Sequence, residues 1–405
     1  MNRRMDREKI NIGVYRLADY AKTERHIKEI SDCGLDFVIG VDYDDRKTLD
    51  LFAKYNIGSI GNGGNPGWWG GDGNNAGKLA ETNPMEKYIA ASKKFIDHPA
   101  LWGIDVGDEP SALDFPYYGK VIAECEKLYP NQFAYLNLYP NYASVAENNA
   151  SQTVNQLGTA TYDEHIAEYC KYVDTDYICY DFYLYSIDVN RAYKNLITVS
   201  DACRNSGRDM WIVLQVNSNR PAEWITENGL RFQAYTAMAY GARNITWACY
   251  TAGWWYNQVL DDKGEKTQQY DKLKKVNAEI HFLDTVYKNY RNVAAYLVGN
   301  HEFYKGETAK SIDLGFARNI KADDDNAIAV GLMTGKTDCS KTALFIAAAD
   351  DPYDKNSKEY KVTFDSYKQS ITAINQNGKL PVEKTGEYSY AVTVKSNDGV
   401  IIEIK

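Results

Sequence analysis

Strand-like runs alternate with helix-like stretches through the first 290 residues of this 405-residue chain. Each run is apolar or β-branched and is followed by a longer segment with helical periodicity, the pattern of a parallel sheet with crossover helices. Eight such units in about 290 residues predict a (β/α)₈ TIM barrel over residues 1–290. The strand-like runs are Asn11–Arg16, Asp36–Val41, Gly58–Gly63, Trp102–Glu109, Phe133–Tyr139, Tyr177–Tyr183, Met210–Asn217 and Asn244–Tyr250.

The intervening segments carry apolar residues three and four positions apart, as amphipathic helices do. An open, doubly wound sheet also alternates strands and helices, but it needs a glycine-rich phosphate turn after its first strand. The segment Tyr15-Arg16-Leu17-Ala18 has no glycine, so we favour the closed barrel. The helix candidates include Glu24–Cys33, Pro84–Ile96, Tyr118–Leu128, Tyr162–Tyr172, Arg191–Arg204 and Leu230–Tyr240.

The pattern changes to strands alone after a last helical stretch, Tyr270–Tyr290. Turn signals such as Asn377-Gly378 separate several of these strands. We expect a small all-β sandwich domain over residues 291–405, with a structural or auxiliary role. Its expected strands are Ala327–Met333, Thr342–Ala347, Tyr360–Phe364, Ser370–Ile374, Tyr388–Val394 and Val400–Ile404.

The charge balance limits the partners that this chain can have. It carries 46 basic and 55 acidic residues, a net charge of −9, which repels phosphate backbones and anionic lipids. No apolar run reaches the roughly 18 residues that cross a bilayer. We therefore expect neither a nucleic-acid nor a membrane partner. The opening residues lack the apolar core of a secretory signal, which predicts a cytoplasmic protein, or a secreted one if a signal has been removed.

We expect no cofactor and no metal. The seven cysteines are scattered, with no CxxC spacing, and none of the five histidines lies near the end of a predicted strand. The GxSxG, HExxH and GxxxxGK[ST] motifs are absent from the sequence. A carboxylate-only site at Asp105, Asp108 and Glu109 would lack the further ligands that a hard cation requires.

Two adjacent carboxylates, Asp108 and Glu109, end the fourth predicted strand. Active sites of such barrels lie at the C-terminal ends of the strands. Two adjacent carboxylates are unfavourable there unless a function requires them. Pro110 should hold Glu109 extended. Alternatively, Asp108 caps the next helix and Glu109 is a solvated loop residue. Strand alternation predicts one shared face for Gly103, Asp105, Gly107 and Glu109.

The segment Asp108-Glu109-Pro110 resembles the Asn-Glu-Pro motif that ends strand four of clan-A-like glycoside hydrolases. The resemblance continues loosely at Asn137-Leu138-Tyr139-Pro140, at Tyr180-Asp181-Phe182-Tyr183 and along Phe232–Trp247. It implies a glycosidase with Glu109 as general acid/base. The chain departs from the family at strand seven, where Gln215 occupies a region that carries a nucleophilic glutamate, and glutamine cannot be that nucleophile.

A second carboxylate must then come from elsewhere. Asp181 is the first choice, because an aromatic wall could hold it near a sugar ring; otherwise it is a buried residue bonded to Arg16 or to backbone amides. Asp108 is the second, since an adjacent Asp-Glu pair resembles hexosaminidases that use the substrate's acetamido group as nucleophile. Glu223 is the third, but its surroundings predict the start of a helix, where an acidic residue is favoured anyway.

Sugar sites pair carboxylates with aromatic faces, because one face of a pyranose is apolar. Trp68 and Trp69 lie in a Gly/Asn-rich loop after the third predicted strand, and Trp254 and Trp255 follow the eighth. These tryptophans either line the sugar or anchor their loops. The remaining candidates for binding sugar are Arg16, Asn137, Tyr139, Tyr183 and Gln215.

Two functions remain open from the sequence. The first is a glycosidase that acts on an oligosaccharide or another small glycoside, with Glu109 as its central acid. The second is a non-catalytic carbohydrate-binding barrel that has lost the strand-seven nucleophile and keeps Glu109 as a ligand.

Overall fold

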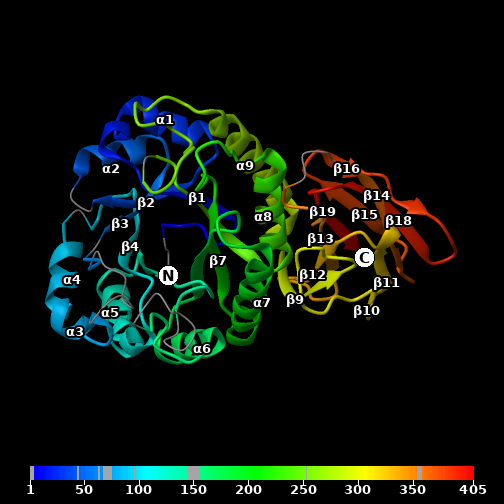
Figure 1. The fold of residues 1–405 in the computed structure, drawn as a ribbon, viewed down its shortest axis with the longest axis horizontal. Coiled ribbons are helices and arrows are strands. Elements are labelled where there is room, and N and C mark those ends of the chain that lie inside the picture. The colour runs from blue at the N-terminus through cyan, green and yellow to red at the C-terminus, as the bar shows by residue number, and fades with distance from the viewer. Residues whose placement is uncertain are drawn as a thin grey trace.

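Figure 1 shows the fold in a computed structural model, with a helix-ringed barrel beside a smaller unit made of strands. The structure describes residues 4–42, 45–62, 64–66, 75–94, 96–144, 155–251, 253–349, 351–353 and 358–405.

The predicted TIM barrel is confirmed. Eight parallel strands close in chain order, with β1 paired to both β2 and β8. Their bounds agree with the predicted runs to within two residues at either end. The strands are β1 (Asn11–Tyr15), β2 (Phe37–Asp42), β3 (Gly58–Asn62), β4 (Leu101–Asp108), β5 (Phe133–Leu138), β6 (Tyr177–Phe182), β7 (Asp209–Gln215) and β8 (Ala242–Ala248).

Local capping decides where the surrounding helices begin and end, which periodicity alone does not fix. The helix predicted from Arg191 begins earlier, at Val189, because Asp188 accepts the backbone N–H of Arg191. It ends at Ser206, and the residue that follows it is Gly207, whose φ of 72° favours glycine. The helical elements are η1 (Asp19–Ala21), α1 (Glu24–Asp32), α2 (Arg46–Lys54), α3 (Leu79–Thr82), α4 (Met85–Ser92), η3 (Ala112–Asp114), α5 (Phe115–Leu128), α6 (Tyr162–Tyr172), α7 (Val189–Ser206), α8 (Glu227–Ala239) and α9 (Gln268–Tyr287).

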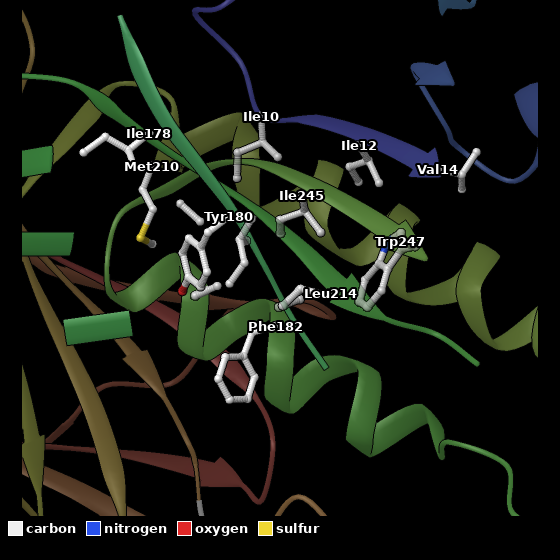
Figure 2. Packing of buried hydrophobic residues seen from close by; sticks show 14 of the residues in the cluster. Ile10, Ile12, Val14, Ile178, Tyr180, Phe182, Met210, Leu214, Ile245 and Trp247 are labelled. Carbon is white, nitrogen blue, oxygen red and sulfur yellow. The ribbon is translucent and has the colours of Figure 1, made fainter. Parts of the chain in front are cut away.

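Side chains of the barrel strands alternate between two packed layers. On β7, Trp211 and Val213 belong to the cluster that fills the barrel, and Trp211 stacks on Tyr177 with ring centroids 4.0 Å apart. Met210 and Leu214 belong instead to the outer layer, which packs against the helices. Figure 2 shows this outer layer on β1, β6, β7 and β8. Alternation therefore holds the barrel together from both sides.

Two antiparallel sheets follow the barrel, as predicted for a β-sandwich. One sheet has the order β10-β11-β14-β18-β17 and the other β16-β15-β19-β13-β12-β9. Val330, Leu344, Val362, Phe364 and Val392 lie in the core between them. The elements are β9 (Tyr290–Val298), β10 (Ile312–Leu314), β11 (Ala317–Ala322), η4 (Asp323–Asp325), β12 (Ile328–Gly335), β13 (Thr342–Ala347), β14 (Glu359–Asp365), β15 (Ile371–Asn375), β16 (Gly378–Leu380), β17 (Glu383–Lys384), β18 (Ser389–Lys395) and β19 (Gly399–Ile404).

The sandwich packs on the barrel through α8, which lies against β12 and β13 (Figure 1). Asn292 on β9 donates to the carbonyl oxygen of Ala239 at 2.9 Å. Gly331 on β12 approaches the same carbonyl so closely that a Cβ there would lie 2.2 Å from the oxygen. The junction is therefore a close-packed contact.

Within the described ranges, no helix combines the length and the apolar character that a membrane span needs.

Candidate active site

A β-bulge in β4 sets which of its residues face the barrel interior. The register of β4 against β5 shifts between Asp105 and Gly107, so strict alternation fails there. Gly107 was expected to share a face with Asp105, and this was wrong. A Cβ on Gly107 would lie 2.4 Å from the Tyr118 hydroxyl on α5, so Gly107 faces the helices. The bulge leaves both Asp105 and Asp108 lining hollows at the barrel mouth.

The backbone of Glu109 turns directly after β4. Its φ is 45°, in the left-handed region, so the expected extended conformation before Pro110 was wrong. The Glu109 N–H donates to the carbonyl oxygen of Asn137 at 2.8 Å, which ties the turn to the end of β5. This turn brings the Glu109 side chain to the cavity beside Asp108.

Asn137 at the end of β5 connects carboxylates from the strands on either side. Its Nδ2 donates to Asp108 Oδ1 at 3.0 Å and to Asp181 Oδ1 at 2.7 Å. The Cys179 thiol donates to its Oδ1 at 3.4 Å, which fixes the orientation of the amide. Asp108 therefore faces the site, and its proposed role as cap of the following helix was wrong. Asp181 bonds Asn137 rather than Arg16.

The carboxyl groups of Glu109 and Asp181 lie near enough to affect protonation of the pair. Oδ1 of Asp181 accepts from Asn137, while its buried Oδ2 has no hydrogen-bond partner among the described residues. Burial and the charge of Asp108 raise the pKa of Asp181 to about 7, although Asn137 and Glu109 lower it. Burial and the charge of Asp181 in turn raise the pKa of Tyr142, in the loop after β5. The site can therefore hold a neutral and an ionised carboxyl group side by side near neutral pH.

The two carboxyl groups of β4 are also shifted. Burial raises the pKa of Asp108, against the bonds from Asn137 and the Glu109 N–H. Burial and the charge of Asp108 raise the pKa of Asp105 to about 8, and Asn65 donates to Asp105 at 3.2 Å. Strongly shifted groups that gather at one end of a barrel are typical of functional sites.

The carboxyl groups of Asp108, Glu109 and Asp181 line a cavity of about 540 Å³ at the C-terminal ends of the strands. Tyr183 packs edge-on against Trp255 with centroids 5.1 Å apart, and Trp254 lies 5.5 Å from the ring of Tyr15. Ring faces beside carboxyl groups suit a sugar, which offers both apolar and hydroxyl surface. The aromatic lining residues are Tyr15, Tyr135, Tyr139, Tyr142, Tyr183, Trp254 and Trp255.

A second hollow of about 620 Å³ adjoins the first. The two share Tyr15, Asp108 and Trp254 in their walls. Arg16, a predicted sugar ligand, lines the second hollow together with Asp105. The mouth of the barrel therefore offers two adjacent hollows separated by aromatic rings and one carboxylate.

The structure brings most of the predicted site residues to the first cavity: Glu109, Asp181, Asp108, Asn137, Tyr139, Tyr183, Trp254 and Trp255. It does not bring Gln215 there. Gln215 is fully buried, and its side chain bonds the N–H of Tyr185, the Ser186 hydroxyl and the Asn217 carbonyl. Trp68 and Trp69 lie outside the described residues.

Glu223 lies outside both hollows. It is exposed and pairs with Arg220 at 2.9 Å. It was expected at the start of a helix, but α8 begins only at Glu227, with Thr226 as its cap.

Sequence reasoning missed Tyr15, Tyr135 and Tyr142 as lining residues. The signal for Tyr15 was available, because it is the last residue of β1 and strand ends face the site. Tyr142 follows β5 by four residues, and only the path of that loop brings it to the cavity that Asp181 also lines.

No protein-family model matches the sequence, and no curated protein matches it either. A solved structure of a family 42 β-galactosidase from G. stearothermophilus, a catalytic mutant, is similar with a TM-score of 0.60 at 7% identity, over 100% of this chain and 100% of that chain. A family 30 subfamily 8 xylanase from Clostridium acetobutylicum has a TM-score of 0.46 at 12% identity, over 98% and 97%. The likeness to the β-galactosidase shows a shared fold, which confirms the fold expected from the resemblance to clan-A-like glycoside hydrolases.

Proposed function

We propose that the protein is a glycosidase in which Glu109 is the general acid/base and Asp181 its partner. The observation that carries this proposal is the gathering of the two carboxyl groups in the lining of one aromatic cavity, where the pKa of Asp181 is raised to about 7. Glycosidases use a carboxyl pair in which one member holds a proton and the other does not. The cavity and the likeness to a β-galactosidase fold add support.

The proposed chemistry follows from this pair. Glu109 gives its proton to the glycosidic oxygen as the bond from that oxygen to the anomeric carbon breaks. The carboxylate of Asp181 attacks the same carbon, and water then releases the sugar while Glu109 takes back a proton. We propose this retaining route, which needs about 5–5.5 Å between the carboxyl groups, over an inverting one at about 6.5–9.5 Å, because Glu109 lies near enough to Asp181 to lower its pKa.

Asp108 offers a second route with the same acid. It faces the cavity next to Glu109 and is held by Asn137. In this route Asp108 would orient an acetamido group of the substrate, which would itself act as nucleophile. The route restricts the enzyme to N-acetylhexosaminides.

The lining of the cavity favours an uncharged substrate. Three acidic side chains line it, and no lysine, arginine or histidine does so within the described part of the chain. An anionic sugar would be repelled there. We propose a neutral oligosaccharide or another small neutral glycoside as the substrate.

A non-catalytic sugar-binding barrel is the alternative function, and one observation favours it. The end of β7 carries Gln215, which is buried and bonded away from the cavity, where clan-A-like enzymes carry their nucleophile. If Asp181 does not replace that nucleophile, the cavity would bind sugar without cleaving it.

Turnover of a panel of neutral glycosides tests the choice between these functions. We expect at least one hydrolysed substrate, and at least about a hundredfold lower rate for Glu109→Gln. Glu223→Gln is the matched control, since Glu223 is an exposed glutamate outside the cavity, and it should retain the parent rate. Sugar binding by the parent protein without any turnover would contradict the glycosidase and support the binding protein.

The strand pattern also supports a domain division near residue 290. α9 ends at Tyr287, and β9, the first strand of the sandwich, begins at Tyr290. We propose that residues 291–405 form an auxiliary domain, because the aromatic and acidic residues of the cavity all come from residues 1–290.

A further inference from the structure

A basic hollow of about 450 Å³ lies at the opposite end of the barrel from Glu109. It is formed where β7 and β8 begin, beside the end of α7, and β9 and β12 of the sandwich close it. Its charged lining residues are Arg204, Arg208, Arg243, Arg291, Lys336 and Asp209. Five cations against one carboxylate set this hollow apart from the acidic cavity at the other end.

The single carboxylate of the lining is already neutralised. Asp209 Oδ2 accepts from Arg7 Nη2 at 2.5 Å. Two of the cations are likewise paired, Lys336 with Glu8 at 2.8 Å and Arg204 with Asp201.

The other three arginines of the lining are not paired in this way. Among the residues that the structure describes, no ion pair involves Arg208, Arg243 or Arg291. Arg291 bonds only the neutral side chains of Thr334 and Cys339. Three guanidinium groups of one hollow thus lack a counterion in the part of the chain that the structure describes.

Arg243 is the least exposed of the three, at 8%. One end of its guanidinium donates to the carbonyl of Tyr290, and the group lies over the ring of Tyr287, 4.6 Å from the centroid. Its Nη1 is buried without a hydrogen-bond partner among the described residues. The guanidinium of Arg208 is arranged in the same way: Nη2 donates to the Cys170 carbonyl at 3.2 Å, and Nη1 is buried with no partner in the described ranges. Buried donors without acceptors are unfavourable, and an anion would supply the acceptors.

The surrounding protein offsets only part of this charge. Asp284 and Glu8 feel the charge of Arg243 without pairing with it. The C-terminal end of α7 adds about half a negative charge near Arg204. Neither contribution provides an acceptor for the buried Nη1 atoms. The hollow therefore remains electropositive and short of acceptors.

We propose that this hollow binds a tetrahedral oxyanion, the phosphate or sulfate ester group of a small ligand. Planar guanidinium groups bind such groups through paired N–H donors, and several arginines can share the oxygens of one dianion. A volume of about 450 Å³ exceeds one inorganic anion and falls in the range of small-molecule sites. The proposal does not depend on the glycosidase assignment, because the two hollows lie at opposite ends of the strands.

Titration of the full chain with inorganic phosphate at constant ionic strength tests this proposal. We expect saturable binding, with the Nε–Hε signals of Arg208, Arg243 and Arg291 shifting in ¹⁵N-arginine-labelled protein. The double variant Arg208→Gln, Arg291→Gln should bind at least about tenfold more weakly. Arg318→Gln is the matched control, since Arg318 is exposed on β11, away from the hollow, and it should bind like the parent.

Parallel titrations with sulfate and acetate distinguish the possible anions. Tighter binding of phosphate than of sulfate would assign a phosphate ester, and the reverse a sulfate ester. Acetate binding as tightly as both would show general charge attraction and overturn the proposal. Phosphate-induced shifts that spare the signals of the three arginines would also overturn the proposal, and this readout does not depend on the folding of a variant. An unchanged Kd in the folded double variant would overturn it as well.

Discussion

The carboxyl group of Glu109, just after β4, lines the same cavity as that of Asp181 on β6 and lowers the pKa of Asp181. The strand between them supplies Asn137, whose amide also holds Asp181 and Asp108. Three neighbouring strands thus contribute one connected acidic group, and its burial keeps protons on carboxyl groups that would be ionised in water.

Replacing the two aspartates separately should separate the two catalytic routes. Asp181→Asn removes the proposed nucleophile, so we expect turnover to fall at least about a hundredfold on any substrate. Asp108→Asn can still accept from Asn137 and should retain more activity. Kinetics of both variants, with melting curves to verify folding, provide the test. Full activity of Asp181→Asn, with hydrolysis confined to N-acetylhexosaminides, would favour the acetamido route.

The raised pKa of Asp105 predicts a pH-dependent loss of stability. The folded state favours the neutral form of Asp105, and this preference contributes stability. The stability is fully present below about pH 4 and is lost as the pH rises through about 8. Asp105→Asn removes the titration and can still accept from Asn65. We expect the variant to gain Tm relative to the parent between pH 5 and pH 8.5.

Thermal melts of the parent and the variant across this range measure the effect. Asp262→Asn, at an exposed position, is the control and should follow the parent. A Tm difference between Asp105→Asn and the parent that stays constant with pH would contradict the assignment.

Trp254 and Trp255 should contribute to sugar binding. Each lines the cavity and is partly exposed. Stacking on a sugar ring is worth on the order of 1–2 kcal/mol, so Trp→Ala at either position should raise KM about five- to thirtyfold with little change in Tm. Trp224→Ala is the control, because Trp224 is partly exposed outside the cavity. Lower Tm with unchanged KM would mean that these tryptophans anchor their loop. The same role for Trp68 and Trp69 stays a prediction.

The junction between barrel and sandwich should be sensitive to one methyl group. A Cβ at Gly331 would meet the Ala239 carbonyl oxygen at 2.2 Å, so Gly331→Ala should lower the free energy of unfolding by about 1–3 kcal/mol. At Gly315 an added Cβ meets no atom within 4 Å, and Gly315→Ala is the control. Denaturant titrations measure both. Equal stability of the two variants would show that the junction can relax.

The sequence predicted the barrel well because eight repeated units leave few alternative topologies. It also identified Asp108, Glu109, Asn137 and Asp181, since unusual polar residues at strand ends are visible in the chain. The bulge in β4 left no comparable signal: Gly107 looked like an inward residue and instead makes room for Tyr118. Bulges and left-handed turns are determined by packing between elements.

Other features depended on contacts distant in sequence. β9 is not among the predicted strands, and the predicted helical stretch ends at its first residue, Tyr290; its alternation is weak and only pairing with β12 defines it as a strand. The approach of Tyr142 to Asp181 depends on the course of a loop. The domain boundary at residue 290 and the cytoplasmic or secreted location stay predictions.

The leaving-group dependence of Glu109→Gln tests the central claim most directly. General acid help matters only when the departing oxygen needs a proton. We predict that kcat/KM of the folded variant falls at least about a hundredfold on an oligosaccharide or an alkyl glycoside, and little on the corresponding dinitrophenyl glycoside. An equal loss on both substrates, or no loss on either, would contradict the assignment of Glu109 as the general acid.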